Sequence, residues 1–338
     1  MAEFRKVRVN KATKATRQKI KASIGIDGLS GNGKTGLALE LSAILADNDF
    51  NKIYVADAEN NSALQYVGRK LYSGTRVPKE EDKTFHHSTL DNETGYSPFN
   101  YQMLQQEAKE LGCEVFIQDT YSNMWNRKDG VLDMKSQVEA HAKQKVYRDS
   151  YGAWGHPDVM EGKNLIFDLV RSQDMHIIST MRVKDDIVRG FDETKNRTTI
   201  EKVGVKQIQS DGLDYEFDLV LRVIRPANVE KNTPTRIEVS KSRYDILQKG
   251  EEYDITTGLL ESIKEYLKEG VDASVLNERQ RVEMAEDLKR RAQEKPVLVQ
   301  VFKKRFGEDK DGNKRKIKDL TLKELRELNS RFISIENN

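Results

Sequence analysis

The sequence has one cysteine, Cys113, among its 338 residues. A single thiol cannot form a disulfide within the chain, so packing must hold the fold together, and a reducing compartment is expected. No apolar run approaches the ~18 residues that a membrane-spanning helix needs. The basic N-terminal segment also lacks the hydrophobic stretch of a secretory signal. These absences predict a soluble protein of the cytoplasm with no membrane partner.

A strong net charge is missing as well, because the formal charge is only +2 at pH 7. This value argues against a uniformly basic coat for binding DNA. The charge is nevertheless uneven, since residues 1–21 are rich in Lys and Arg and contain one acid, Glu3. Such an arm suits a polyanion, and a solvated tail is the alternative. We therefore separate residues 1–22 as a basic N-terminal arm.

Strand-like and helix-like segments alternate after this arm. The predicted strands are short and apolar, at 24–27, 52–57, 114–119 and 175–182. Helical patterns lie between them, among them 101–111 and 163–172. This alternation is typical of an α/β fold with a mostly parallel central sheet that is covered on both faces.

The character of the chain changes after Arg182. Three further strand-like segments with short turns follow, at 198–208, 215–224 and 234–242. They predict antiparallel strands added at one edge of the sheet.

From residue 259 onward the pattern is helical. Thr321 and Glu324 form a capping-box pattern, and apolar residues then repeat at helical spacing. We therefore divide the chain after the arm into a core, 23–258, and a small helical C-terminal extension, 259–338.

The segment from Gly28 to Thr35, GLSGNGKT, matches the phosphate-binding pattern G-x-x-x-x-G-K-[ST]. Its glycines let backbone N–H groups turn inward toward phosphate oxygens, and the start of the next helix faces the same place. Lys34 is expected to reach the β- and γ-phosphates of ATP, and the Thr35 hydroxyl is expected to bind Mg²⁺. The expected nucleotide-binding residues are Gly28, Ser30, Gly31, Asn32, Gly33, Lys34, Thr35 and Gly36.

A phosphate-binding loop also needs an acid at the end of a neighbouring strand to organise the metal. Asp119 in VFIQD fits this role, and Asp57 in IYVAD is its rival. Glu59 lies two residues beyond the second strand, where a carboxylate can hold and deprotonate an attacking water. On local sequence alone, Glu59 could instead be an acid at a helix N-terminus or a surface charge.

The chain resembles the RecA family of recombinase-type ATPases in three ordered stretches, DGLSGNGKTGLAL, IYVADAENNSALQYVGRKL and EVFIQDTYSNM. The resemblance implies a RecA-like P-loop core that hydrolyses ATP with Mg²⁺. It implies that Glu59 is the general base and that Asp119 organises the metal.

A phage-associated branch of these ATPases, linked to single-strand annealing and recombination, is similar over further segments. These are HIISTMRVKDD, VGVKQIQSDGLDYEFDLVLRV and VSKSRYDIL, in the same order. Together the similarity spans roughly residues 23–248. It implies single-stranded DNA as a partner and a phage protein in the cytoplasm of a bacterial host.

The family also supplies basic residues to the active site of a neighbouring subunit, and Lys241 and Arg243 match those positions. A cation supplied in trans would stabilise charge on the transferred phosphoryl group. The match implies a homo-oligomer with active sites at subunit interfaces. The alternative for both residues is a solvated strand face.

One position departs from the family pattern, because Thr180 stands where a glutamine senses the γ-phosphate. Arg182 or Lys184 could take over that role. The departure affects the expectation of full strand exchange more than that of ATP hydrolysis.

DNA contacts are expected in the region after the fourth strand. The candidates are Arg189, Lys195, Arg197, Lys202 and Lys206. Trp125, Tyr151 and Trp154 could stack on bases, or they could pack an insertion between themselves.

These observations predict an Mg-ATP-dependent ATPase acting on single-stranded DNA in phage-type recombination, annealing or replication. The first alternative is a helicase, helicase loader or other DNA motor. The second is a nucleotide-gated scaffold that binds a replication or single-strand-binding protein and hydrolyses little ATP.

Overall fold

The computed structural model describes residues 15–172, 174–192, 197–224, 235–271, 273–308 and 312–336. The chain divides into two compact units. The core unit comprises residues 21–267, and the C-terminal unit comprises residues 268 onward together with the segment that precedes residue 21. Most of the predicted basic arm, residues 1–14, lies outside the described part of the chain.

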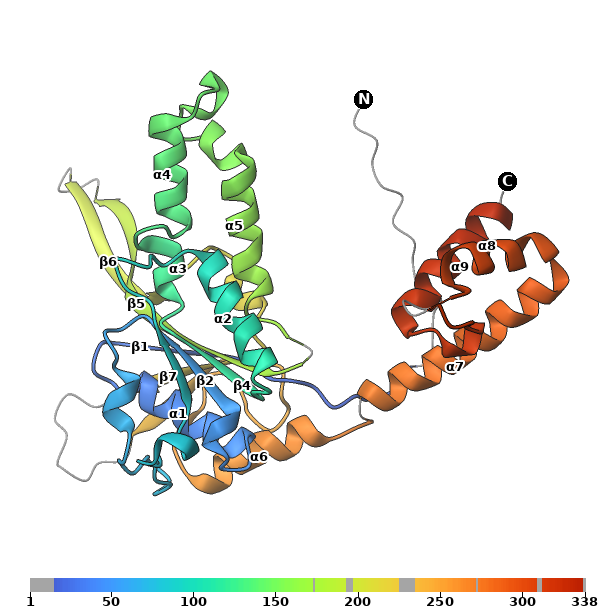
Figure 1. Ribbon diagram of the computed structural model, residues 1–338. Helices are drawn as coiled ribbons and strands as arrows, with labels where there is room; N and C mark the ends of the chain where they lie inside the picture. The colour runs from blue at the N-terminus through green and yellow to red at the C-terminus, as the bar shows by residue number, and fades with distance from the viewer. Residues whose placement is uncertain are drawn as a thin grey trace. The chain divides into compact units, whose positions relative to one another are not determined.

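A nine-stranded sheet forms the centre of the core unit in the order β3-β2-β4-β5-β1-β7-β8-β9, and β6 pairs with β5 off this path (Figure 1). The strands are β1 (Ser23–Gly28), β2 (Ile53–Asp57), β3 (His86–Thr89), β4 (Val115–Asp119), β5 (His176–Asp192), β6 (Arg197–Gln207), β7 (Leu219–Ile224), β8 (Arg236–Ser242) and β9 (Glu252–Asp254). Neighbours from β3 to β7 run parallel, whereas β8, β9 and β6 are antiparallel to their partners.

The sequence therefore predicted an α/β fold with a mostly parallel sheet and antiparallel strands correctly, but it placed two of the later strands wrongly. We expected 215–224 to be antiparallel, and β7 instead pairs with β1 in parallel, with Ile24 opposite Leu219. We also expected 198–208 at the same sheet edge, and β6 forms a hairpin with β5. The first error arises because the pairing of β7 with β1 is a contact between distant segments, whereas β6 pairs with the strand directly before it in sequence.

Helices cover both faces of this sheet (Figure 1). One face packs Ile24, Val55 and Ile117 against α1 (Lys34–Leu45) and α6 (Thr257–Lys268). The other packs Tyr54 and Phe116 against α2 (Pro98–Glu110) and α5 (Pro157–Asp168). The alternation follows from strand geometry, because successive side chains point to opposite faces. α6 packs in the core unit, so this unit ends at Leu267 and not at the expected residue 258.

Two hairpins extend from the core unit beyond the sheet (Figure 1). One is the ribbon of β5 and β6, which pairs from Val183 opposite Gln207 to Asp192 opposite Arg197. The other is helical and contains α4 (Val131–His141) and α5, with α3 (Ser122–Asn126) at its base. The ribbon begins where β5 leaves β1 at Arg182, and the helical hairpin follows the carboxyl end of β4, which places both on the side of the sheet where ligands bind in α/β folds.

The C-terminal unit has its own apolar core. It contains α7 (Ala273–Glu294), α8 (Pro296–Phe306) and α9 (Leu322–Glu336), which pack through residues such as Leu288, Leu298 and Phe332. The expected capping box is confirmed: Thr321 N donates to Glu324 at 2.8 Å, and Glu324 N donates to the Thr321 hydroxyl at 3.3 Å.

Candidate nucleotide-binding site

The register of the parallel strands brings the candidate residues together at the carboxyl ends of the strands. Asp57 pairs with Asp119 at the carboxyl ends of β2 and β4, and Gly28 pairs with Arg182 between β1 and β5. The glycine loop connects β1 to α1 at this same end of the sheet. Residues that are far apart in the chain are thus assembled where α/β folds bind ligands.

The backbone of the loop adopts conformations that favour glycine. Gly31 and Gly33 have φ angles of 78° and 94°, in the left-handed region. A Cβ at Gly33 would also meet the hydroxyl of Tyr72, which itself donates to the Gly33 carbonyl at 3.3 Å. α1 begins at Lys34, directly after Gly33.

Lys34 is folded over this loop. Its Nζ donates to the carbonyls of Gly28 and Leu29, at 3.1 Å each, and the residue is 7% exposed. Burial lowers the pKa of Lys34, although the nearby carboxylates of Glu59 and Asp119 act in the opposite direction. A dehydrated cation surrounded by backbone groups is suited to binding an anion.

Asp119 is fully buried and receives hydrogen bonds on both carboxylate oxygens. Thr35 donates to Oδ2 at 2.7 Å, Ser62 donates to the same oxygen at 3.2 Å, and Thr180 donates to Oδ1 at 2.5 Å. Burial raises the pKa of Asp119 to about 6, and the hydrogen bonds from Thr180 and Thr35 limit the rise. Thr180 thus hydrogen-bonds to Asp119 at the centre of the site. The sequence did not indicate this role for Thr180.

Asp57, the rival of Asp119, and Glu59, the expected base, lie at and just beyond the end of β2 and differ in what surrounds them. Asp57 is fully buried, and its oxygens accept the backbone N–H groups of Glu59 at 2.8 Å and Ala63 at 2.9 Å. His87 adds a third contact at 3.3 Å. Asp57 therefore shapes the turn that follows β2, whereas the Glu59 side chain projects from that turn.

Glu59 forms an ion pair with Arg182, whose Nε lies 3.0 Å from Oε1. Both side chains remain partly exposed, at 26% for Glu59 and 36% for Arg182. Arg182 is held in turn by its backbone N–H, which donates to Ser122 at 2.9 Å. Arg182 directly precedes Val183, where the pairing of β5 with β6 begins. The ion pair therefore connects the β5–β6 hairpin to the Glu59 carboxylate.

A second ion pair, with a fully buried acid, lies just before the loop and was not predicted. Asp27 has no exposed surface; Arg222 on β7 donates to its two oxygens at 2.8 and 3.1 Å, and Gln207 at the end of β6 donates at 2.5 Å. The alternation of apolar residues around Asp27 gave no signal of these partners. The network ties the hairpin to the strand that enters the loop.

The donor set fits Mg²⁺ bound together with phosphates. The Thr35 hydroxyl and the Asp119 carboxylate are oxygen ligands within hydrogen-bonding distance of each other, and Mg²⁺ commonly takes one or two such protein groups and completes its shell with water and phosphate. Among the described residues, no group of three or more His, Cys, Asp or Glu side chains forms a metal cage.

Lys241 and Arg243 are not brought to this site within the chain. Ser242 pairs with Leu219, which pairs with Ile24, so both residues lie by the start of β1 and not by its end. Four strand residues separate that level from Gly28, about 13 Å at ~3.3 Å per residue. Lys241 donates to the Asp214 carbonyl at 2.6 Å, and Arg243 pairs with Asp218 at 2.9 Å. Arg243 follows the last residue of β8, so the shared strand face that we expected does not extend to it.

The expected DNA contacts fall on the β5–β6 hairpin and not on a loop-rich region. Lys195 and the side chains of Arg189, Arg197 and Lys202 lie outside the described part of the chain. Lys206 is described and pairs with Asp211 at 2.9 Å.

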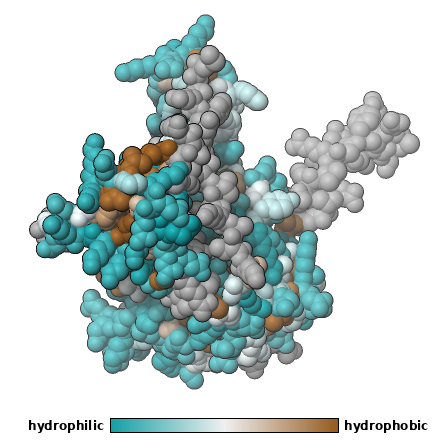
Figure 2. All heavy atoms as spheres, turned by 90° about the vertical axis from the view of Figure 1, so that its right-hand side faces the viewer, coloured by the Kyte–Doolittle hydropathy of each residue, from teal (hydrophilic) through white to brown (hydrophobic). Residues whose placement is uncertain are grey.

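The tryptophans pack within the helical hairpin. Trp125 and Trp154 stack with ring centroids 6.1 Å apart, and Lys163 lies over Trp154. Tyr151 is 92% exposed. On the face shown in Figure 2, hydrophilic residues predominate and hydrophobic ones gather in a few small areas. Single exposed apolar residues are normal on such surfaces, so Tyr151 alone does not indicate a site.

Comparisons with known proteins add no identification. No protein-family model matches the chain. A search of curated proteins also finds no matching sequence. Within the described residues, no helix is both long and apolar enough to cross a bilayer.

Proposed function

We propose that this protein is an Mg²⁺-dependent ATPase of the RecA-like P-loop class that acts on single-stranded DNA. The observation that carries the proposal is the assembly of Lys34, Thr35, Asp119 and Glu59 at the carboxyl edge of a parallel sheet. The DNA part rests on the sequence resemblance and on the hairpin that begins beside Arg182.

Each of these residues has a distinct task in the proposed reaction. The loop N–H groups and Lys34 hold the phosphates, while Thr35 and Asp119 hold Mg²⁺, which when bound neutralises phosphate charge. Glu59 accepts a proton from the water that attacks the γ-phosphorus, and the bond from that phosphorus to the bridging oxygen of ADP breaks. Arg182 orients the Glu59 carboxylate through their ion pair.

Loss of the loop lysine should abolish tight nucleotide binding. We expect Lys34→Ala to weaken Mg-ATP binding by roughly 100-fold or more, since charge-assisted hydrogen bonds to phosphate are lost together with a buried cation. Calorimetric titration of the full chain measures this effect. Lys52→Ala is the matched control. Lys52 directly precedes β2 and pairs with Glu114, which directly precedes β4, so the pair lies at the amino ends of these strands and away from the loop. Unchanged affinity in a folded Lys34→Ala protein would contradict the assignment.

Mg-ATP binding should depend on pH through Asp119. Its pKa is raised to about 6, so the carboxyl group is protonated below that pH and must lose a proton to support the metal. Apparent Mg-ATP affinity should therefore fall up to about tenfold per pH unit below 6. In Asp119→Asn, affinity should be lower but should lose this part of the pH dependence. An identical pH profile in the two proteins would show that Asp119 is not the titrating group.

The same shift has a consequence for stability. Because the folded pKa is raised above the unfolded value of about 3.9, the contribution of Asp119 to stability is fully present below that value and is lost as pH rises through about 6. Thermal unfolding without nucleotide, compared between the wild type and Asp119→Asn, measures it.

A further inference from the structure

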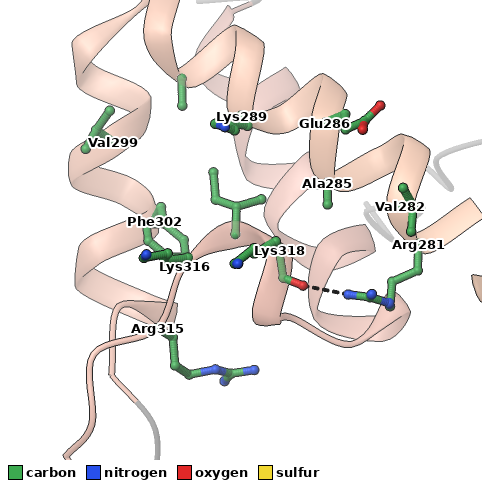
Figure 3. Close-up of a pocket in the computed structure, with 12 residues that line it drawn as sticks. Arg281, Val282, Ala285, Glu286, Lys289, Val299, Phe302, Arg315, Lys316 and Lys318 are labelled. Atoms are coloured by element: carbon green, nitrogen blue, oxygen red, sulfur yellow. Dashed lines mark hydrogen bonds between the residues drawn. The ribbon is translucent and has the colours of Figure 1, made fainter.

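The C-terminal unit contains a pocket of about 570 Å³ between α7, α8 and the segment that precedes α9 (Figure 3). Its apolar lining consists of Val282, Ala285, Ala292, Val299, Phe302 and Ile317. Val282 is 42% exposed, so apolar surface is accessible from solvent here. Such a surface can accept an apolar side chain from a partner.

Basic residues surround this apolar surface. They are Arg281, Lys289, Arg315, Lys316 and Lys318, and the one acid among the lining residues is Glu286. Figure 3 shows Lys316 and Lys318 beside each other, with the Glu286 carboxylate pointing away from them.

The two arginines and the three lysines have different roles. Arg281 donates to the Lys318 carbonyl at 2.6 Å and also binds Glu278, while Arg315 binds Glu324 at 2.8 and 2.9 Å. The arginines thus hold the walls of the pocket in place. Lys289, Lys316 and Lys318 are exposed and present their charges to solvent.

We propose that this pocket binds an acidic peptide segment of another protein. An apolar side chain of the peptide occupies the apolar lining between Val282 and Val299, and its carboxylates face Lys289, Lys316 and Lys318. The argument is charge complementarity around an apolar centre, the arrangement by which peptide grooves obtain both affinity and specificity.

Two other occupants fit less well. Single-stranded nucleic acid binds through bases stacked on accessible aromatic rings, but Phe302 is the one aromatic residue in the lining and is only 9% exposed. The N-terminal segment of this chain is basic and would be repelled by the lysines.

The test uses the full chain and fluorescently labelled peptides, with binding followed by anisotropy. The first peptide has two leucines flanked on both sides by aspartates. A second peptide replaces the aspartates by asparagines, and a third replaces the leucines by serines. We expect the first to bind and each of the others to bind roughly tenfold more weakly or worse. Since this comparison needs no protein variant, it does not depend on how substitutions affect folding.

Charge-reversed proteins locate the site. Lys289→Glu combined with Lys318→Glu should weaken binding of the first peptide by roughly tenfold. Lys303→Glu combined with Lys323→Glu is the matched control, since these lysines are exposed and do not line the pocket, and it should leave binding unchanged.

Three results would overturn the proposal. The first is no binding of the acidic peptide up to about 1 mM, a free energy too small for a specific site. The second is an equal loss in the control protein, which would indicate general charge attraction. The third is displacement of the peptide by labelled oligothymidylate that depends on Lys289 and Lys318, which would assign the pocket to nucleic acid.

Discussion

Replacing Glu59 by Gln should lower ATP turnover at least about 100-fold, the scale expected for a general base. The amide keeps the size of the side chain and can still accept a hydrogen bond from Arg182, but it cannot take a proton from water. Mg-ATP affinity should change little, because the Glu59 carboxylate hydrogen-bonds to Arg182 and acts on Lys34 of the glycine loop only through its charge. Phosphate release at saturating ATP and calorimetric binding measure the two effects separately.

The matched control is Glu114→Gln, which makes the same chemical change just before β4 begins, at the other edge of the sheet, where Glu114 pairs with Lys52. It should retain wild-type turnover. Near-normal turnover in Glu59→Gln would move the role of base elsewhere. Asp57 is a poor substitute, because backbone N–H groups already occupy its oxygens.

Replacing Arg243 by Ala should lower turnover by ~10³-fold while leaving ATP affinity nearly intact, if Arg243 stabilises phosphoryl charge in a neighbouring subunit. Arg243 lies by the amino end of β1, whereas Gly28 is at its carboxyl end, and the Arg243 side chain is 52% exposed. A nucleotide bound to a neighbouring subunit is therefore more accessible to Arg243 than one bound to its own chain. Arg290→Ala is the control, because Arg290 is 62% exposed, belongs to the C-terminal unit and pairs with Asp287 and Glu294. Thermal unfolding must accompany the assay, since Arg243 also binds Asp218.

Mixing two inactive proteins tests the shared site directly. Glu59→Gln keeps Arg243, and Arg243→Ala keeps its own base, so a mixed assembly contains some complete sites. Part of the activity should therefore return on mixing. If the mixture stays inactive although the two proteins co-assemble, Arg243 acts within its own chain or is structural.

The local parts of the site were predictable from sequence. Gly28 to Thr35 is one contiguous pattern, and the strand before it and the helix after it follow from apolar periodicity. Asp119 was a candidate because it ends a buried strand, but Asp57 ends one as well, and the contact of Asp119 with Thr35 is what places it beside the loop.

Contacts between distant segments were not predictable. The sequence assigned the role of base to Glu59 and left Asp57 as a rival for the metal, but it did not show the N–H groups that bind Asp57 or the pairing of Arg182 with Glu59. The partners of Asp27 come from β6 and β7, whose positions depend on the sheet order that we placed wrongly. Periodicity reports which face of a strand is buried, but it does not report which strand lies beside it.

The measurement that tests the central claim most directly is phosphate release from Mg-ATP by the purified full chain, with and without oligothymidylate, using Lys34→Ala as the blank. We predict release above the blank that rises when the oligonucleotide is added. Release that exceeds the blank but does not change when the oligonucleotide is added would support the ATPase activity and contradict the proposed DNA partner. Tight Mg-ATP binding with release no higher than the blank, with or without DNA, would contradict the account and favour a nucleotide-gated scaffold.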